Sequence, residues 1–343
     1  MSMTNKNILA LCTTGYFNDR GCHIRILHVI RTLSKTNNIV INAYSTGRTI
    51  ENQRIKRTRR LFANETDYIG FNLRKIILDI YLIFLAVKTF KEENIDKVLC
   101  FTHEAGILGL LMKMIFGVEY LLDYQGSLSK EIVNYNSAFR NKFVKSFIEF
   151  IEKGVERFSE RVIYNTTYSY NESTIKNKML LEDSSEVFTG ISVNKKEKKK
   201  NGYNILWVGV ATKIQGFEEF MKMSENILNS TKNVKIYIVS FPITEKIRKK
   251  FENHKERMIF VGKVNFEKLP QIVSDSDLCI STKKESSEGN SKLHLYKEYG
   301  KDILALRTRA SREILPEKSL VNSYEDMEKE IIKRIKNANN GAS

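Results

Sequence analysis

A loop rich in Gly, Asn and Ser precedes a predicted helix near the C-terminus, an order of residues that suits phosphate binding. The segment KESSEGNSKLHLYKEYGKDILAL covers residues 284–306, with Ser291 as candidate N-cap and Lys292 in the first turn. Free backbone N–H groups and the positive end of the helix dipole attract anions at such a start. The local pattern therefore predicts a site for a phosphate group.

Buried strands and amphipathic helices alternate along the chain, which predicts an α/β fold with two doubly wound domains. The expected strands cover residues 7–13, 39–44, 97–101, 120–123 and 162–165, then 203–208, 235–240, 258–261, 277–281 and 303–306. A polar, charged segment interrupts the pattern at 194–202 and is interpreted as a linker. We therefore expect domains at 1–193 and 203–322. A C-terminal helix within 323–343 follows, and its return to the N-terminal domain is left open.

Composition points to an anionic partner. The 343 residues include 56 Lys and Arg against 40 Asp and Glu, a formal charge of +16. Nucleic acid, acidic lipid and phosphorylated ligands all fit this excess. The four cysteines are scattered without a C-x-x-C pair, which favours a reducing compartment and argues against zinc. We see no signal peptide and no spanning helix, so the expected location is cytoplasmic, with peripheral placement at the inner membrane face left open.

The C-terminal segment carries a family resemblance. SKLHLYKEYGKDILA resembles the donor-site segment of glycosyltransferase family 4 and related GT-B enzymes. The matching positions are Ser291, Lys292, Leu293, Tyr296, Gly300, Lys301, Ile303 and Ala305. The ribose-binding glutamate of the family falls on Leu295, and its proline on Asp302. The second glutamate of the family motif falls on Ser287, beside Glu288.

Two more segments of the second half resemble donor loops of that family. VGVATKIQGFEEF is similar to the diphosphate loop, with Gly209 and Gly216 matching, Val210 and Gln215 in place of a basic pair, and Lys213 nearby. FVGKVNFEKLPQIVSDSDLCIS matches the spacing of the next family segment. The resemblance places Gly262, Lys263 and Val264 against the nucleobase.

The N-terminal half offers a weaker match. GYFNDRGCHIR resembles the loop beside the acceptor and the donor sugar, through Gly15, Gly21 and Arg25. DYQGSL resembles a segment in which a histidine contacts the donor sugar, and here Gln125 takes that position. An amide orients a hydroxyl but transfers no proton. His103 follows a predicted strand and is the second catalytic candidate, for which a structural role is the alternative.

The resemblance implies a GT-B architecture, with two Rossmann-like doubly wound domains facing a cleft and the nucleotide held by the second. It implies transfer of a sugar from a UDP- or GDP-linked donor to a glycan or lipid-linked acceptor, with retention and without a metal or other cofactor. Lys292 is then the principal charge on the diphosphate, helped by Lys213. Backbone contacts come from Gly289, Asn290 and Ser291, and Glu288 is the candidate ribose acceptor.

Two alternatives remain from other classes. The absent glutamates and basic pair favour a catalytically silent GT-B-like subunit that binds a partner or a glycan. The net charge alone favours a nucleic-acid-binding protein, and the chain lacks the usual aromatic-basic RNA motifs, so this interpretation comes last.

Basic residues also lie beside apolar ones in two parts of the N-terminal half. These are the stretch 48–60 and the predicted helix 140–161, RNKFVKSFIEFIEKGVERFSER. Each basic side chain near an anionic bilayer contributes about 1 kcal/mol of binding. We therefore expect the N-terminal half to dock on an anionic membrane that carries the acceptor. General solubility is the alternative explanation of the charge.

Overall fold

The computed structural model divides into two compact units. It describes residues 4–18, 21–62, 73–130, 141–188, 191–193, 202–286 and 288–340. The first unit is Met1–Asp183 with Ser287–Gly289, and the second is Ser184–Ser286 with Asn290–Ser343. The division falls ten residues before the expected boundary at 193, because Val187 and Phe188 are buried within the second unit, where Phe188 lies 6.0 Å from the Phe266 ring. Most of the predicted linker lies outside the described residues.

The first unit is built on a seven-stranded parallel sheet, as far as its residues are described, in the order β3-β2-β1-β4-β5-β6-β7. The strands are β1 (Asn7–Cys12), β2 (Asn38–Ala43), β3 (Arg54–Arg57), β4 (Lys97–Phe101), β5 (Glu119–Tyr124), β6 (Arg161–Tyr164) and β7 (Lys178–Leu180). The helices are α1 (Gly21–Ser34), α2 (Leu73–Glu92), α3 (Thr102–Phe116), α5 (Lys142–Phe158) and α6 (Thr167–Glu172). The direction of winding reverses between β1 and β4.

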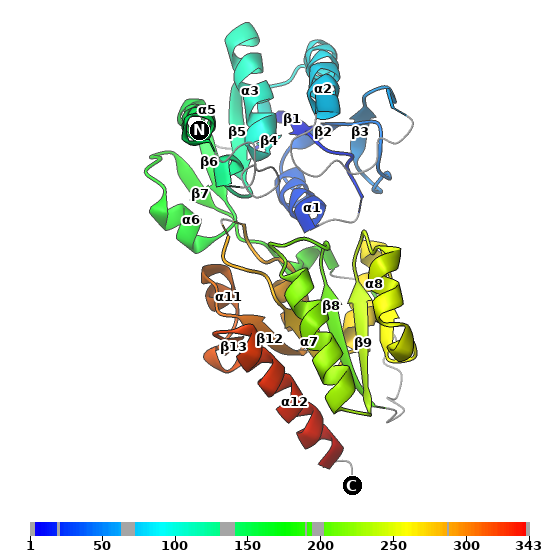
Figure 1. The fold of residues 1–343 in the computed structure, drawn as a ribbon. Helices are drawn as coiled ribbons and strands as arrows, with labels where there is room; N and C mark the ends of the chain where they lie inside the picture. Colours follow the sequence, from blue (N-terminus) through cyan, green and yellow to red (C-terminus); the bar gives the residue numbers. More distant parts are fainter. Residues whose placement is uncertain are drawn as a thin grey trace. The chain divides into compact units, whose positions relative to one another are not determined.

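Three helices of the first unit cover one face of its sheet. Alternate strand residues such as Leu9, Leu11 and Cys100 point to this face and pack against α2, α3 and α5 in a single hydrophobic cluster. The helix α3 lies between α2 and α5 (Figure 1). The buried side of α1 contributes nothing to this cluster, and the doubly wound order puts α1 on the opposite face.

The second unit repeats the plan with a six-stranded parallel sheet in the order β10-β9-β8-β11-β12-β13. Its strands are β8 (Tyr203–Val208), β9 (Val234–Val239), β10 (Met258–Phe260), β11 (Leu278–Ser281), β12 (Asp302–Leu306) and β13 (Leu320–Val321). Its helices are α7 (Phe217–Ser230), α8 (Glu245–Lys250), α9 (Leu269–Ser274), α10 (Lys292–Glu298), α11 (Arg309–Ile314) and α12 (Tyr324–Asn340). The 3-10 turns are η2 (Ser185–Phe188), η3 (Glu252–His254), η4 (Phe266–Lys268) and η5 (Glu317–Ser319).

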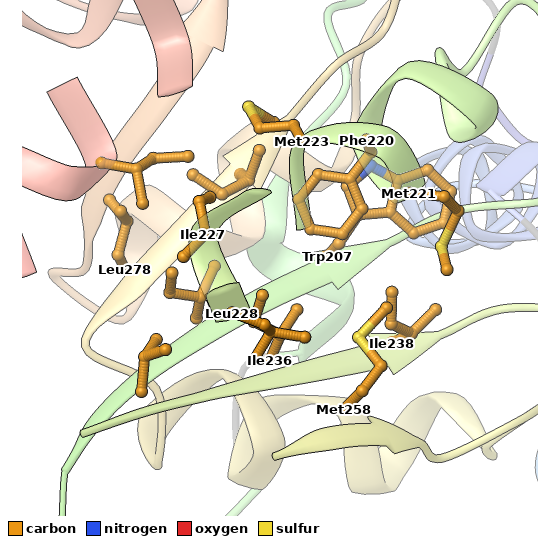
Figure 2. Close-up of a cluster of buried hydrophobic side chains, with 14 of the residues drawn as sticks. Trp207, Phe220, Met221, Met223, Ile227, Leu228, Ile236, Ile238, Met258 and Leu278 are labelled. Carbon is orange, nitrogen blue, oxygen red and sulfur yellow. The ribbon is translucent and has the colours of Figure 1, made fainter. Parts of the chain in front are cut away.

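The core of the second unit is centred on Trp207, whose ring stacks on Phe220 at 5.6 Å (Figure 2). Met327, Ile331 and Ile335 of α12 join the same core, spaced four residues apart on one side of the helix. The C-terminal helix therefore packs within the second unit. Its apolar stripe is the physical reason.

The basic stretch 48–60 differs from its expected form, an exposed helix face or loop. Residues Arg54–Arg57 form the edge strand β3, parallel to β2. Arg57 donates to the backbone oxygens of Thr46 and Arg48, and Lys56 forms ion pairs with Glu92 and Glu93 at 3.0 and 2.9 Å. Lys56 and Arg57 therefore hold the sheet edge, while Arg59 and Arg60 are exposed. The part of this stretch in membrane docking stays a prediction. In the described part of the chain no helix is long and apolar enough to cross a bilayer.

Candidate functional site

The predicted donor loops of the second unit meet at the reversal of its sheet order. They follow β8 and β11, which are neighbouring strands, and ligands of open α/β sheets bind at such a position. The Thr282 hydroxyl donates to the backbone oxygen of Gln215 at 2.8 Å and accepts from the Trp207 indole at 2.7 Å. Gly216 has φ +64°, and a Cβ there would lie 2.2 Å from the backbone oxygen of Thr282. Only glycine allows this approach of the two loops.

Lys292 lies at the centre of this arrangement. Its Nζ donates to the backbone oxygen of Val208 at 2.9 Å and to Gln215 Oε1 at 3.0 Å, and it lies 5.3 Å from the Trp207 ring centre. Burial, and then repulsion from Lys283, lower the pKa of Lys292 to about 7. The amine is therefore about half neutral near pH 7, and a nearby anion would stabilise its charged form. We call this lysine, with Val208, Gln215 and Lys283, the Lys292 site.

The other predicted donor residues divide between this site and its surroundings. Lys283 is buried two residues after the end of β11. The Asn290 amide donates to Ser281 Oγ at 3.0 Å, which holds the start of α10 against the same strand. Lys213 projects from its loop with an exposed side chain, and Gly209 lies against the Trp207 ring.

Gly262, Lys263 and Val264 follow β10, which lies two places from β8 in the sheet. Gly262 has φ +82°, and Lys263 Nζ is 5.2 Å from the Phe241 ring centre. The structure therefore places this predicted nucleobase segment on the same sheet edge as the Lys292 site, at some lateral distance from it.

The helix start differs from its prediction. Ser291 has helical backbone angles, φ −56° and ψ −26°, and makes no capping bond with its side chain. The helix α10 is only seven residues long, so the charge available to an anion comes mainly from lysine and less from the helix dipole. Ser291 therefore occupies the predicted N-cap position without capping the helix through its side chain.

The glutamates of the family motif have no counterpart here. Leu295 is 1% exposed and packs into the second unit, so its position cannot contact a ribose. Glu298, one turn later, accepts from the Ser185 hydroxyl at 2.9 Å. Glu288 belongs to the first unit, where its backbone oxygen accepts from the Tyr168 hydroxyl at 3.3 Å. Gly289 follows, with a Cβ position 3.0 Å from Asn165 Nδ2, and Ser287 lies outside the described residues.

A buried ion pair organises the corresponding sheet edge of the first unit. Arg25 of α1 donates through Nη2 to Asp123 Oδ1 at 2.7 Å and through Nη1 to the Leu181 oxygen at 2.5 Å. Asp183 lies 3.5 Å from the same guanidinium. The side chains of Arg25 and Asp123 are 3% and 0% exposed. Arg25, which matched the family loop in the sequence, therefore forms a buried ion pair that stabilises the first unit. Sequence reasoning missed the pair, although Asp123 stands at the end of a predicted strand.

Gln125 is fixed by the same network. Its Nε2 donates to Asp123 Oδ2 at 2.9 Å. A carboxylate only accepts hydrogen bonds, so the amide nitrogen must face Asp123 and Oε1 is turned away from it. That oxygen can accept from a ligand hydroxyl, the orienting role expected of Gln125. Gly15 follows β1 beside Thr46, and Gly21 is the exposed first residue of α1, next to two residues outside the described part.

His103 lies in a different setting from Gln125. It is 1% exposed, and its Nε2 is 2.9 Å from Glu156 Oε1 and 3.7 Å from Glu152. Glu152 in turn accepts from the backbone nitrogens of Leu128 and Ser129 at 3.1 and 3.3 Å. These three side chains are of metal-binding types, with ligand atoms within 4.8 Å of one another. Their hydrogen bonds join α3 and α5 to the segment after β5. This arrangement corresponds to the structural role that was the alternative to a catalytic one for His103.

Solved structures resemble the chain over nearly its whole length. Sucrose-phosphate synthase from Thermosynechococcus elongatus superposes with TM-score 0.74 at 14% identity, covering 97% of this chain and 90% of its own. Anabaena HepE in complex with UDP-glucose gives 0.71 at 12% identity, with 96% and 89% covered. The catalytic domain of starch synthase IV from Arabidopsis thaliana, bound to ADP and acarbose, gives 0.70 at 8%, with 98% and 92% covered.

The chain has the GT-B fold. The prediction of an α/β protein with two Rossmann-like domains is thereby confirmed. At 8–14% identity the likeness of this GT-B chain to the solved structures establishes its fold alone. No protein-family model matches the sequence, and no curated protein matches it either. Membership of family 4 stays a prediction.

Proposed function

We propose that the chain is a glycosyltransferase and that its second unit holds the diphosphate of a nucleotide-sugar at the Lys292 site. The carrying observation is the chemistry around Lys292. Among the described residues its ammonium group donates hydrogen bonds to two neutral oxygens and to no carboxylate, and a second lysine lies close enough to repel it. A diphosphate would supply the missing negative charge at the sheet position where GT-B chains and other α/β folds bind ligands.

The nucleotide is proposed to be a uridine diphosphate. HepE has been solved with UDP and with UDP-glucose, which supports this class, while starch synthase IV was solved with ADP. Calorimetric titration with UDP, ADP and GDP separates the candidates. We expect UDP to bind more tightly than either purine nucleotide. Equal affinity for all three would favour a site that reads the diphosphate alone, and no binding of any would overturn the proposal.

The proposed reaction breaks the bond between the anomeric carbon and the diphosphate oxygen and forms one to an acceptor hydroxyl, which loses its proton. Lys292 would stabilise the charge that develops on the leaving diphosphate. Gln125 would orient the sugar through a hydroxyl that donates to Oε1. We propose retention at the anomeric carbon, as the resemblance implies, and proton NMR of the product reads the outcome directly. We also expect turnover to survive EDTA, and its loss, with recovery on adding Mg²⁺, would contradict the metal-independent assignment.

A silent nucleotide-binding subunit is the second candidate, favoured by the burial of Leu295 at the ribose position. Radiolabelled UDP-glucose separates the two functions. A transferase should release labelled sugar slowly to water, or pass it to an acceptor added as a membrane extract. A protein that binds UDP but shows neither reaction with any UDP-sugar would be the silent subunit. Glu288→Gln tests the remaining ribose assignment, which is wrong if donor affinity and turnover are both unchanged.

A further inference from the structure

Exposed hydrophobic side chains are concentrated on one layer of the first unit. Among the described residues, 12 of the 14 large hydrophobic side chains that are exposed belong to α2, α3 and α5. These helices lie next to one another on one face of the sheet, with α3 in the middle (Figure 1). Monomeric soluble proteins seldom expose apolar patches of more than a few hundred Å² without a binding role. We call the outer surface of this layer the α2-α3-α5 face.

The helix α5 carries its most exposed part. Phe143, Phe147 and Phe150 are 88%, 63% and 75% exposed, and their spacing of four and three residues places them in one row. Val155 lies about 80° to 140° away from these three around the helix axis and is buried in the core. Aromatic side chains on the outer side of an already packed helix serve neither the core nor solubility. Such a row is a candidate contact surface for a partner.

Basic residues run alongside this aromatic row. Lys142, Lys153 and Arg157 lie within about 60° of one another around the α5 axis, next to Phe143 and Phe150. All three are exposed, and none forms an ion pair with any residue that the structure describes. An amphipathic helix with aromatic and basic rows side by side lies in the interface of a bilayer.

The helices α2 and α3 extend the face. Ile76, Ile80 and Phe84 follow one another at intervals of four residues on the outer side of α2, 42%, 49% and 68% exposed. Lys88, whose Nζ lies 3.8 Å from Glu92, and Lys91 continue that side at the end of the helix. On α3, Met114 is 74% exposed. The pattern of apolar centre and basic border is thus repeated on a second helix.

We propose that the α2-α3-α5 face docks on a membrane that contains anionic lipid. The charge pattern selects this occupant. A second copy of the chain packed face to face would bring the basic residues of α5 against their own kind. Nucleic acid would need the positive charges but would leave the aromatic row uncovered. An anionic bilayer satisfies both, since phosphates neutralise the lysines and the acyl region takes up the apolar side chains.

Liposome flotation of the full chain tests the proposal. We expect recovery with vesicles of 30% phosphatidylglycerol in phosphatidylcholine, little with phosphatidylcholine alone, and a steep fall with added NaCl. Removal of three charges in Lys142→Gln/Lys153→Gln/Arg157→Gln should lower partitioning about 100-fold, roughly fivefold for each charge. The matched control, Lys318→Gln/Lys329→Gln/Lys336→Gln, removes three exposed charges from the second unit and should change partitioning far less.

The aromatic row is tested separately with Phe143→Ser/Phe147→Ser/Phe150→Ser. These side chains are exposed, so circular dichroism and UDP affinity should stay as in the wild type while flotation is lost. Equal recovery with both vesicle types, or none with either, would overturn the proposal. A second result would also overturn it. If the wild type sediments as a dimer and the three serine substitutions convert it to a monomer without changing flotation, the face binds a second copy of the chain.

Discussion

Lys292 shows how a site can keep a basic group whose charge depends on its ligand. Its two hydrogen-bond acceptors are neutral, and its nearest charged neighbour is another lysine. Such surroundings disfavour the ammonium form until an anion arrives. Val210 and Gln215 of the neighbouring loop are uncharged, so in the proposed site the positive charge near a diphosphate would come from this lysine and Lys283, with Lys213 exposed in the same loop.

The lowered pKa of Lys292 gives a signed prediction for stability against pH. The folded pKa is about 7, and the unfolded value is about 10.4, so between these pH values the unfolded chain binds more protons. The free energy of unfolding should therefore rise from pH 7 to pH 9, with a contribution of at most about 1.4 kcal/mol per pH unit from this group. Urea denaturation should show that Lys292→Met lacks this contribution.

The control for that measurement is Lys213→Met, which alters an exposed lysine of the neighbouring loop and should keep the wild-type pH dependence. The net charge of the chain falls toward zero as the pH rises, and this changes the stability of all three proteins alike. The informative quantity is therefore the difference in pH dependence between the variants. Parallel curves for wild type and Lys292→Met would contradict the lowered pKa.

Gly216 gives a prediction about backbone geometry at the same site. Gly216→Ala adds a Cβ 2.2 Å from the Thr282 oxygen at φ +64°, whereas Gly300→Ala adds one at φ +58° with nothing within 4 Å. The second substitution carries only the left-handed backbone strain, of order 1–3 kcal/mol. Gly216→Ala should lose at least about 1 kcal/mol more in urea denaturation and should also weaken UDP binding. Equal losses would mean that the loops move apart freely.

At the scale of elements, Arg25 joins parts of the first unit that are distant in sequence. One guanidinium links α1, the end of β5 and the backbone at Leu181. Removing one partner of a buried pair costs about 3–5 kcal/mol where the other charge is left uncompensated. Asp123→Asn leaves Arg25 with Asp183 at 3.5 Å, so it should lower the free energy of unfolding by less than that, about 2–3 kcal/mol.

Glu149→Gln is the matched control, because it removes the partner of Lys145 in an exposed pair with 48% and 40% exposure. Exposed pairs contribute about 0–1 kcal/mol, so this variant should unfold almost like the wild type. Similar losses of unfolding free energy in both variants would show that the Arg25 network does not stabilise the first unit more than an exposed ion pair does. Asp123→Asn should also weaken sugar-dependent binding, because an asparagine amide can donate as well as accept and so no longer fixes Gln125 Oε1 as the atom that is turned away.

The long elements could be predicted from the sequence because each has its own periodicity. Strand β8 was expected at 203–208 and is found there, and the helix expected at 140–161 is found at Lys142–Phe158 within the described residues. The strands β3, β7 and β13 were missed, since RIKR, KML and LV carry no alternation and form only against a neighbouring strand. Sheet pairing, not local preference, decides such short segments.

The candidate site was less accessible to sequence reasoning. The loops after β8 and β11 could be located, because strand ends mark them. The contact of Lys292 with Val208 and Gln215 spans 84 and 77 residues, and no local pattern encodes it. His103 was left between two roles for the same reason, as its partners on α5 lie some 50 residues away.

On the scale of the whole molecule, the two units offer separate spectroscopic signals. Trp207 is the single tryptophan of the chain and is fully buried in the core of the second unit. Its fluorescence therefore reports the unfolding of that unit, while circular dichroism reports both. UDP at 100 times its Kd adds about 2.7 kcal/mol to the unit that binds it.

We therefore expect UDP to raise the melting temperature seen by Trp207 fluorescence by several degrees and to shift part of the circular dichroism transition with it. ADP, as the weaker ligand, should shift it less at the same concentration. A shift seen by circular dichroism without any change in the tryptophan transition would place the nucleotide in the first unit.

The most direct test of diphosphate binding at Lys292 is calorimetric titration with UDP at pH 8 in two buffers of different ionisation enthalpy. The difference between the two heats gives the number of protons taken up. The wild type should take up a fraction of a proton, because the bound diphosphate raises the pKa of Lys292. Lys292→Met should bind about 10- to 150-fold more weakly, the equivalent of 1.5–3 kcal/mol, without proton uptake. Equal affinity and equal proton uptake in the two proteins would contradict the assignment.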